Sequence, residues 1–230
     1  DIHNAVFGIS AGLIAAFLIA ILIIDPATSK EFLDGLKWQI IGTFDSLFMW
    51  SANIFVIFCL ALIVSPFGKI RLGGDDAKAD YSRLSWIAML FAAGMGIGLM
   101  FWGVAEPLAY YTGWYETPLN VVANTPEAAE LALGATMFHW GLHPWSIYGV
   151  VALSMAFFAY NKGLPLSIRS AFYPILGDRT WGWPGHIIDI FAVLATLFGL
   201  ATSLGLGAQQ AAAGFHHVFG IEAGLTLQIT

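Results

Sequence analysis

The chain has 230 residues, of which 58% are hydrophobic and only 10% are charged, with a formal net charge of −6 at pH 7. Soluble domains are about 45–50% apolar and about 25% charged, so this composition excludes a water-soluble globular fold and indicates an integral membrane protein. The acidic balance excludes the basic surface of a nucleic-acid-binding protein. The single cysteine, Cys59, excludes a disulfide framework.

Five apolar stretches are long enough to cross a bilayer, which takes about 20 residues in a helix. They comprise residues 5–24, 46–66, 84–105, 131–160 and 187–215. A further apolar segment starts at Gly224 and stops with the sequence at Thr230, and the sequence opens on Asp1 rather than on methionine. We therefore expect a piece of a longer all-α, multi-pass membrane protein, with five spans and the start of a sixth.

The basic residues alternate between the loops that join these spans. Four lie between the second and third spans and three between the fourth and fifth, whereas the first loop holds only Lys30 and Lys37 and the third holds none. Cytoplasmic loops carry an excess of lysine and arginine. The pattern therefore predicts that the N-terminus and the second and fourth loops are cytoplasmic.

The third span contains glycine at alternate positions, in the string Gly94-Met95-Gly96-Ile97-Gly98. Each glycine costs about 1 kcal/mol relative to alanine inside a helix. In transporters, a helix broken at membrane depth offers carbonyls to cations and N–H groups to anionic substrates. A small-residue contact through Gly94 and Gly98 is the alternative. Such a contact does not explain the additional Gly96, and this glycine therefore favours a break.

The fourth span contains three aromatic residues, Trp140, Trp145 and Tyr148, which an uninterrupted helix would place on one side. Aromatic faces can bind a quaternary ammonium by cation–π attraction, worth about 2 kcal/mol when desolvated. Packing against neighbouring helices explains the rings equally well. From spacing alone, both interpretations stay open.

Other polar residues in the spans have weaker signals. His139 and His143 have a metal-ligand spacing, but without a third ligand nearby a hydrogen-bonding role is favoured. Pro144 predicts a kink. Glu106, at the outer end of its span, is expected to be interfacial and exposed, and Asp189, near the inner end of the fifth span, is interfacial or buried.

The fifth span carries small residues at every fourth position, which favours close helix packing. These residues are Ala195, Gly199, Ser203 and Gly207. Hydroxyls at Thr196, Thr202 and Ser203 could coordinate a hard cation, although such hydroxyls more often bond back to their own helix.

Three strings now resemble one known family. The run from Gly94 to Pro107, with the sequence GMGIGLMFWGVAEP, closely resembles the signature of the betaine/carnitine/choline transporter family. The string from His139 to Tyr148 looks like that family's next signature helix, and residues 201–207 are similar to the segment that follows. The resemblance covers essentially the whole chain and is most specific over residues 84–210.

Membership would imply a twelve-helix secondary transporter with the inverted five-plus-five repeat of the sodium-symporter-like (LeuT-type) fold. Residues 1–83 would then form two leading transmembrane helices and a cytoplasmic loop. Residues 84–230 would form the first three helices of repeat one and the start of the next, without the second repeat.

The implied activity is alternating-access symport of a trimethylammonium osmolyte such as glycine betaine, choline or carnitine. It would take place in a bacterial inner membrane, with a homotrimer as the implied assembly. No enzyme activity is expected, and no cofactor apart from sodium as a coupling ion.

The resemblance also assigns a substrate site. Trp140, Trp145 and Tyr148 match the family's aromatic box for the trimethylammonium group. The five residues from Gly94 to Gly98, including Met95, Gly96 and Ile97, match the unwound segment beside the substrate.

Sodium sites are implied in the same way. Ala92 and Met95 match backbone carbonyls of one site, and Thr196 matches a hydroxyl of a second. Leu200 stands where sodium-coupled members have another threonine, so a sodium-independent substrate/product exchanger is a rival. A non-transporting structural or sensory subunit is the rival from outside transport.

Overall fold

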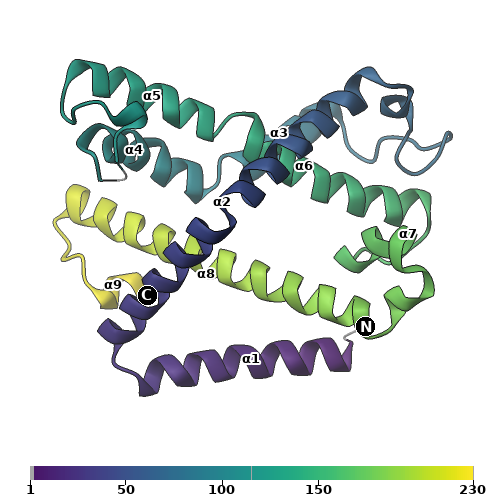
Figure 1. The fold of residues 1–230 in the computed structure, drawn as a ribbon, viewed down its shortest axis with the longest axis horizontal. Helices are drawn as coiled ribbons and strands as arrows, with labels where there is room; N and C mark the ends of the chain where they lie inside the picture. The colour runs from purple at the N-terminus through teal and green to yellow at the C-terminus, as the bar shows by residue number, and fades with distance from the viewer. Residues whose placement is uncertain (1–2, 115, 230) are drawn as a thin grey trace. The chain divides into compact units, whose positions relative to one another are not determined.

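Helices make up all of the regular structure in the computed structural model, which describes residues 3–114 and 116–229 (Figure 1). The helices form two compact units, each assembled from two separate stretches of chain. Asp1–Ala77 and Leu142–Thr196 form the first unit, whereas Lys78–Gly141 and Leu197–Thr230 form the second. The division of the chain by inverted repeats is a different kind of division and stays a prediction.

The first unit contains the two leading helices, a crossing helix and a series of short helices. Its elements are α1 (Asn4–Ile23), α2 (Pro26–Val64), η1 (Pro66–Lys69), α6 (Leu142–Ala156), η3 (Phe157–Asn161), η4 (Ile168–Phe172), α7 (Tyr173–Leu176), η5 (Gly177–Trp181) and the beginning of α8 (Trp183–Phe219). The η3 segment is a π-helical turn that continues α6.

Helix α2 begins twenty residues before the predicted second span, so the prediction of a loop carrying Lys30 and Lys37 is wrong. The carboxylate of Asp25 caps the helix by accepting from the backbone N–H of Ala27 at 3.0 Å and of Thr28 at 3.2 Å. Asp34 then pairs with both lysines at 3.4 Å. Charged residues interrupt the apolar run that was used to predict the span, but lysine is a good helix former. The helix therefore continues where the apolar run does not.

Helices α2 and α6 cross and are joined by polar contacts (Figure 1). Asn53 Oδ1 lies 3.1 Å from His143 Nε2, and the Cys59 thiol donates to the carbonyl of Ser146 at 3.9 Å. Gly149 lies beside Cys59, where a Cβ would be 4.0 Å from the sulfur. These contacts fix the leading helix α2 against α6.

A buried ion pair anchors the beginning of α8. Arg169, only 7% exposed, donates from Nε to Asp189 Oδ2 at 2.6 Å, and its backbone N–H donates to Asp189 Oδ1 at 3.2 Å. Asp189 is therefore the counter-ion of a buried arginine. His186 Nδ1 lies 3.2 Å from an Arg169 guanidinium nitrogen. Its ring centroid lies 4.1 Å from that of His3, which precedes α1, with the two rings tilted by 44°.

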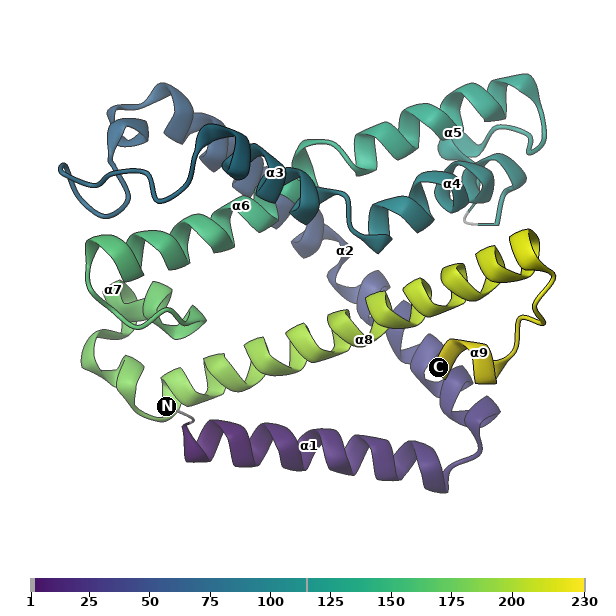
Figure 2. The same ribbon diagram turned by 180° about the vertical axis from the view of Figure 1, so that it is seen from behind.

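The second unit contains the glycine-rich span and the helix that packs on it. Its elements are α3 (Arg83–Gly94), α4 (Ile97–Thr112), η2 (Pro118–Asn120), α5 (Pro126–His139), the end of α8 and α9 (Leu225–Ile229). Side chains of Ser82 and Thr125 cap α3 and α5 by accepting backbone N–H groups at 3.2 Å. Figure 2 shows α4 running beside α5.

Four helical segments in the described part of the chain are long and apolar enough to cross a membrane, and one of them consists of α5, α6 and η3 together. The bent pair of α3 and α4 counts as a fifth. All five predicted spans therefore correspond to helical elements. Large apolar side chains on these helices are exposed, among them Leu22 at 84% and Val64 at 86%. Such surfaces suit lipid rather than water.

Candidate functional site

The glycine-rich span is broken, as the alternating glycines predict. Helix α3 ends at Gly94, α4 begins at Ile97, and the two are bent by 49°. Between them, Met95 has φ −94° and ψ 40°, and Gly96 is extended at φ −72° and ψ 175°. The last carbonyls of α3 and the first N–H groups of α4 therefore lack partners in their own helices.

Two neighbours approach the first turn of α4 closely. A Cβ on Gly98 would lie 3.9 Å from Cη2 of the Trp140 indole, and a Cβ on Gly207 would lie 3.4 Å from Cγ1 of Ile97. An aromatic ring from the end of α5 and a small residue of α8 thus contact the start of α4. All of these residues belong to the second unit.

The fourth span is also interrupted, at Trp140. Helix α5 ends at His139 and α6 begins at Leu142, while Trp140 has φ −88° and ψ 6°. Pro144 lies four residues after Trp140 and cannot donate a hydrogen bond to its carbonyl, and a proline ring crowds that carbonyl. The helix is therefore interrupted just before Pro144, and the predicted kink itself stays a prediction. The placement of the three aromatic rings on one uninterrupted helix is wrong, because the break lies between Trp140 and the other two.

The burial of Glu106 differs from the prediction made from the sequence. Its side chain was expected to be exposed, yet the residue is only 4% exposed within α4. Glu106 Oε2 accepts the indole N–H of Trp140 at 2.7 Å, and Oε1 pairs with His139 Nδ1 at 2.6 Å. A carboxylate in an apolar span needs such partners. The signal in the sequence was its place directly before Pro107, at the outer end of the predicted span.

The other two aromatic residues belong to α6 in the first unit. Trp145 and Tyr148 form an edge-to-face pair with ring centroids 6.2 Å apart and an interplanar angle of 77°. They are 42% and 58% exposed. The pair therefore presents aromatic surface on α6.

The residues implied for sodium have oxygens of the required kind. Ala92 lies in the last turn of α3 and Met95 follows that helix, so their carbonyls lie at the break. The hydroxyl of Thr196 donates to the carbonyl of Ala192 at 2.7 Å, and Thr202 bonds to Phe198 in the same way. A hydroxyl that donates keeps its oxygen lone pairs. The assignment of sodium to these residues stays a prediction.

The two histidines bond to different partners. His139 pairs with Glu106, and His143 with Asn53 of α2. Across residues 3–114 and 116–229, no group of three or more histidine, cysteine, aspartate or glutamate residues is arranged to hold a metal ion. The hydrogen-bonding role favoured from the sequence is confirmed for both.

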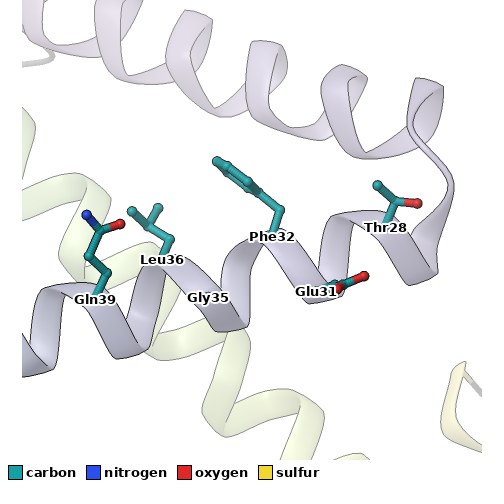
Figure 3. A pocket seen from close by; sticks show the side chains of 6 residues that line it. All are labelled: Thr28, Glu31, Phe32, Gly35, Leu36 and Gln39. Atoms are coloured by element: carbon teal, nitrogen blue, oxygen red, sulfur yellow. The ribbon is translucent and has the colours of Figure 1, made fainter.

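A surface hollow of about 390 Å³ lies on the first turns of α2 (Figure 3). Phe32 and Leu36 point from α2 toward α1 in this view. No residue implied in substrate or sodium binding lines the hollow. Its lining residues are Thr28, Glu31, Phe32, Gly35, Leu36 and Gln39.

Comparison with known proteins assigns the family. The model of the betaine/carnitine/choline family of transporters matches residues 5–230. The chain belongs to this family. Its members are transporters rather than enzymes, and the apolar helices of the chain fit a multi-pass membrane protein.

Several known proteins are similar in sequence to this chain along most or all of its length. It is 79% identical over its whole length to glycine betaine transporter 1 of Vibrio parahaemolyticus, and 63% identical to a glycine betaine/proline/choline/ectoine transporter of the same organism. It is 40% identical over 96% of its length to the high-affinity choline transport protein of Escherichia coli. The chain spans 44%, 41% and 32% of the lengths of these relatives.

Proposed function

We propose that this chain is the N-terminal part of a twelve-helix LeuT-type transporter that carries a betaine-like trimethylammonium osmolyte across a bacterial inner membrane. The names of the relatives support the substrate class, and the proportion of their length that the chain covers supports a larger protein. In this proposal residues 1–83 are the leading helices and their loop. Residues 84–230 begin the first inverted repeat, and a second repeat completes the site.

The observation that carries the proposal is the broken α3–α4 span with the Trp140 ring beside Gly98 on the first turn of α4. Free N–H groups at a helix N-terminus favour an anionic group, here the carboxylate of a betaine. The methyl groups of a trimethylammonium carry no N–H to donate, so an aromatic face is its suitable partner. The family resemblance adds Trp145 and Tyr148 as further aromatic partners of the cation.

We further propose that a sodium gradient drives the transport. The carbonyls of Ala92 and Met95 and the hydroxyl of Thr196 are the oxygens offered to the ion. An ion couples to transport when it binds the substrate-binding conformation better than the other conformation. The distribution of basic residues supports a cytoplasmic N-terminus, and a homotrimer is the assembly that we propose.

A sodium-independent substrate/product exchanger is the second candidate. Leu200 lies one turn after Thr196 and is 51% exposed, and its side chain has no oxygen to offer a cation. By the family resemblance, a second sodium site in this chain would lack one side-chain ligand that sodium-coupled members have. This observation favours an exchanger over a symporter that uses two sodium ions.

The test is uptake by the full-length protein in liposomes, with radiolabelled glycine betaine and an inward sodium gradient. Replacing sodium with potassium on both sides is the matched control. Uptake that collapses without sodium supports symport, whereas uptake that persists and depends on internal substrate supports exchange. If no saturable uptake of glycine betaine, choline or carnitine is measured in either salt, the proposed function is wrong.

A further inference from the structure

Glu106 is a buried carboxylate in an apolar span, a position that costs free energy unless the charge is compensated. It is 4% exposed and accepts two short hydrogen-bonding contacts, from Trp140 Nε1 at 2.7 Å and His139 Nδ1 at 2.6 Å. Hydrogen bonds to ionised acceptors are roughly twice as strong as neutral ones. The Glu106 carboxylate therefore holds the Trp140 indole firmly.

The position of Trp140 in the chain explains why its ring needs such a contact. The residue is the C-cap of α5 and precedes the start of α6, so its side chain lies at a break between two helices. Its indole meets α4 at two places: the N–H bonds to Glu106, and Cη2 lies 3.9 Å from the position that a Cβ on Gly98 would take. These two residues are eight positions apart, about 12 Å along the helix. The ring thus keeps a fixed orientation relative to the first turn of α4.

This geometry links the two halves of the proposed substrate site. The carboxylate of the substrate meets the start of α4, and the trimethylammonium meets the face of Trp140. A zwitterion of fixed length binds well only when these two groups are a fixed distance apart. The bond from Trp140 to Glu106 sets that distance through a single helix.

We propose that Glu106 is a positioning residue for substrate binding, which acts by holding the Trp140 indole against α4. The inference rests on the proposed function, and it adds a residue that does not itself touch the substrate. The negative charge also polarises the hydrogen-bonded indole, which makes its face a better partner for a cation.

The test is a double-mutant cycle in the full-length transporter, with KM, Vmax and the amount of protein in the membrane measured for each variant. Glu106→Leu removes the acceptor, Glu106→Gln keeps an acceptor without the charge, and Trp140→Phe keeps a ring without the N–H. Glu130→Gln on the exposed side of α5 is the control for loss of a carboxylate.

A hydrogen bond to a charged group is worth about 1.5–3 kcal/mol, so Glu106→Leu is expected to raise KM about tenfold or more. Glu106→Gln is expected to raise it less, and Glu130→Gln to leave it unchanged. In the Trp140→Phe background, the further effect of either Glu106 change is expected to fall to about twofold or less, because the shared bond is already gone.

Three outcomes would overturn the inference. One is a wild-type KM in both Glu106 variants, and another is an equally large effect in the Trp140→Phe background. The third is a loss of Vmax in Glu106→Gln with KM unchanged, because that result shows a role outside binding. If Glu106→Leu fails to reach the membrane, the inference is judged from Glu106→Gln in the wild-type and Trp140→Phe backgrounds. A wild-type protein that transports none of the three substrates would instead overturn the proposed function, and this inference with it.

Discussion

The second unit contains two helix breaks of opposite origin. At Met95–Gly96 the break lies within a run of alternate glycines that weakens the helix, whereas at Trp140–Gly141 it lies just before Pro144, four residues after Trp140. The glycine break leaves backbone groups at the end of α3 and the start of α4 without partners in their own helices. The proline break instead places a large side chain outside a regular helix. One break thus offers polar backbone, and the other presents an aromatic ring to it.

The largest effect is expected where the two breaks meet, at Gly98. A leucine there would push its outer carbons into the space of the Trp140 ring, since even a Cβ lies 3.9 Å from Cη2. We expect Gly98→Leu to lower the uptake rate at limiting substrate about a hundredfold, as when an aromatic contact worth about 2–3 kcal/mol is lost. Gly103→Leu on the same helix, where nothing lies within 4 Å of a Cβ, is the control. Equal losses in both variants would contradict the contact.

A smaller effect is expected when the proline break is repaired. Pro144→Ala restores an N–H that can donate to the carbonyl of Trp140, and a proline inside a helix costs about 3 kcal/mol. We expect an unchanged or higher melting temperature together with a KM raised about tenfold, since Trp140 turns away from α4 as the helix closes. Pro126→Ala, at the first position of α5, should alter neither value. A lower melting temperature with a normal KM would show that the break serves only the fold.

The smallest effect is expected at Gly96. Its φ of −72° and ψ of 175° suit any residue, and nothing lies within 4 Å of a Cβ there. Gly96→Ala should therefore change KM and the amount of protein in the membrane by less than about twofold, because no strain or clash is introduced. Uptake kinetics and immunoblotting of membranes provide both values. A much lower Vmax would mean that another conformation of the transport cycle needs the glycine.

The sequence predicts what depends on local composition. The five spans follow from hydropathy, and the break at Gly96 follows from a glycine pattern that packing alone does not require. The beginning of α2 was missed because capping by Asp25 and pairing by Asp34 extend a helix without apolar residues.

The environment of Glu106 depends on residues distant in the chain. Its partners, His139 and Trp140, lie 33 and 34 positions further on, and no local pattern records that contact. The predicted arrangement of the aromatic rings was wrong for a different reason. A helical wheel assumes continuity, and Pro144 removes that continuity before Trp145 is reached. Residue type identified the aromatic candidates, but only the structure shows which ring lies beside α4.

Helix α2 has 39 residues and is therefore about 58 Å long, whereas the hydrocarbon core of a bilayer is about 30 Å thick. Even at a tilt of about 40°, the upper end of the usual range, only about 26 residues fit inside that core. Counted back from Val64, the apolar depth ends close to Trp38. The amine of Lys37 sits 4.9 Å above that ring, a pair typical of the headgroup boundary. The first three turns of α2, with the hollow of Figure 3, therefore exceed the length of helix that the hydrocarbon core can hold.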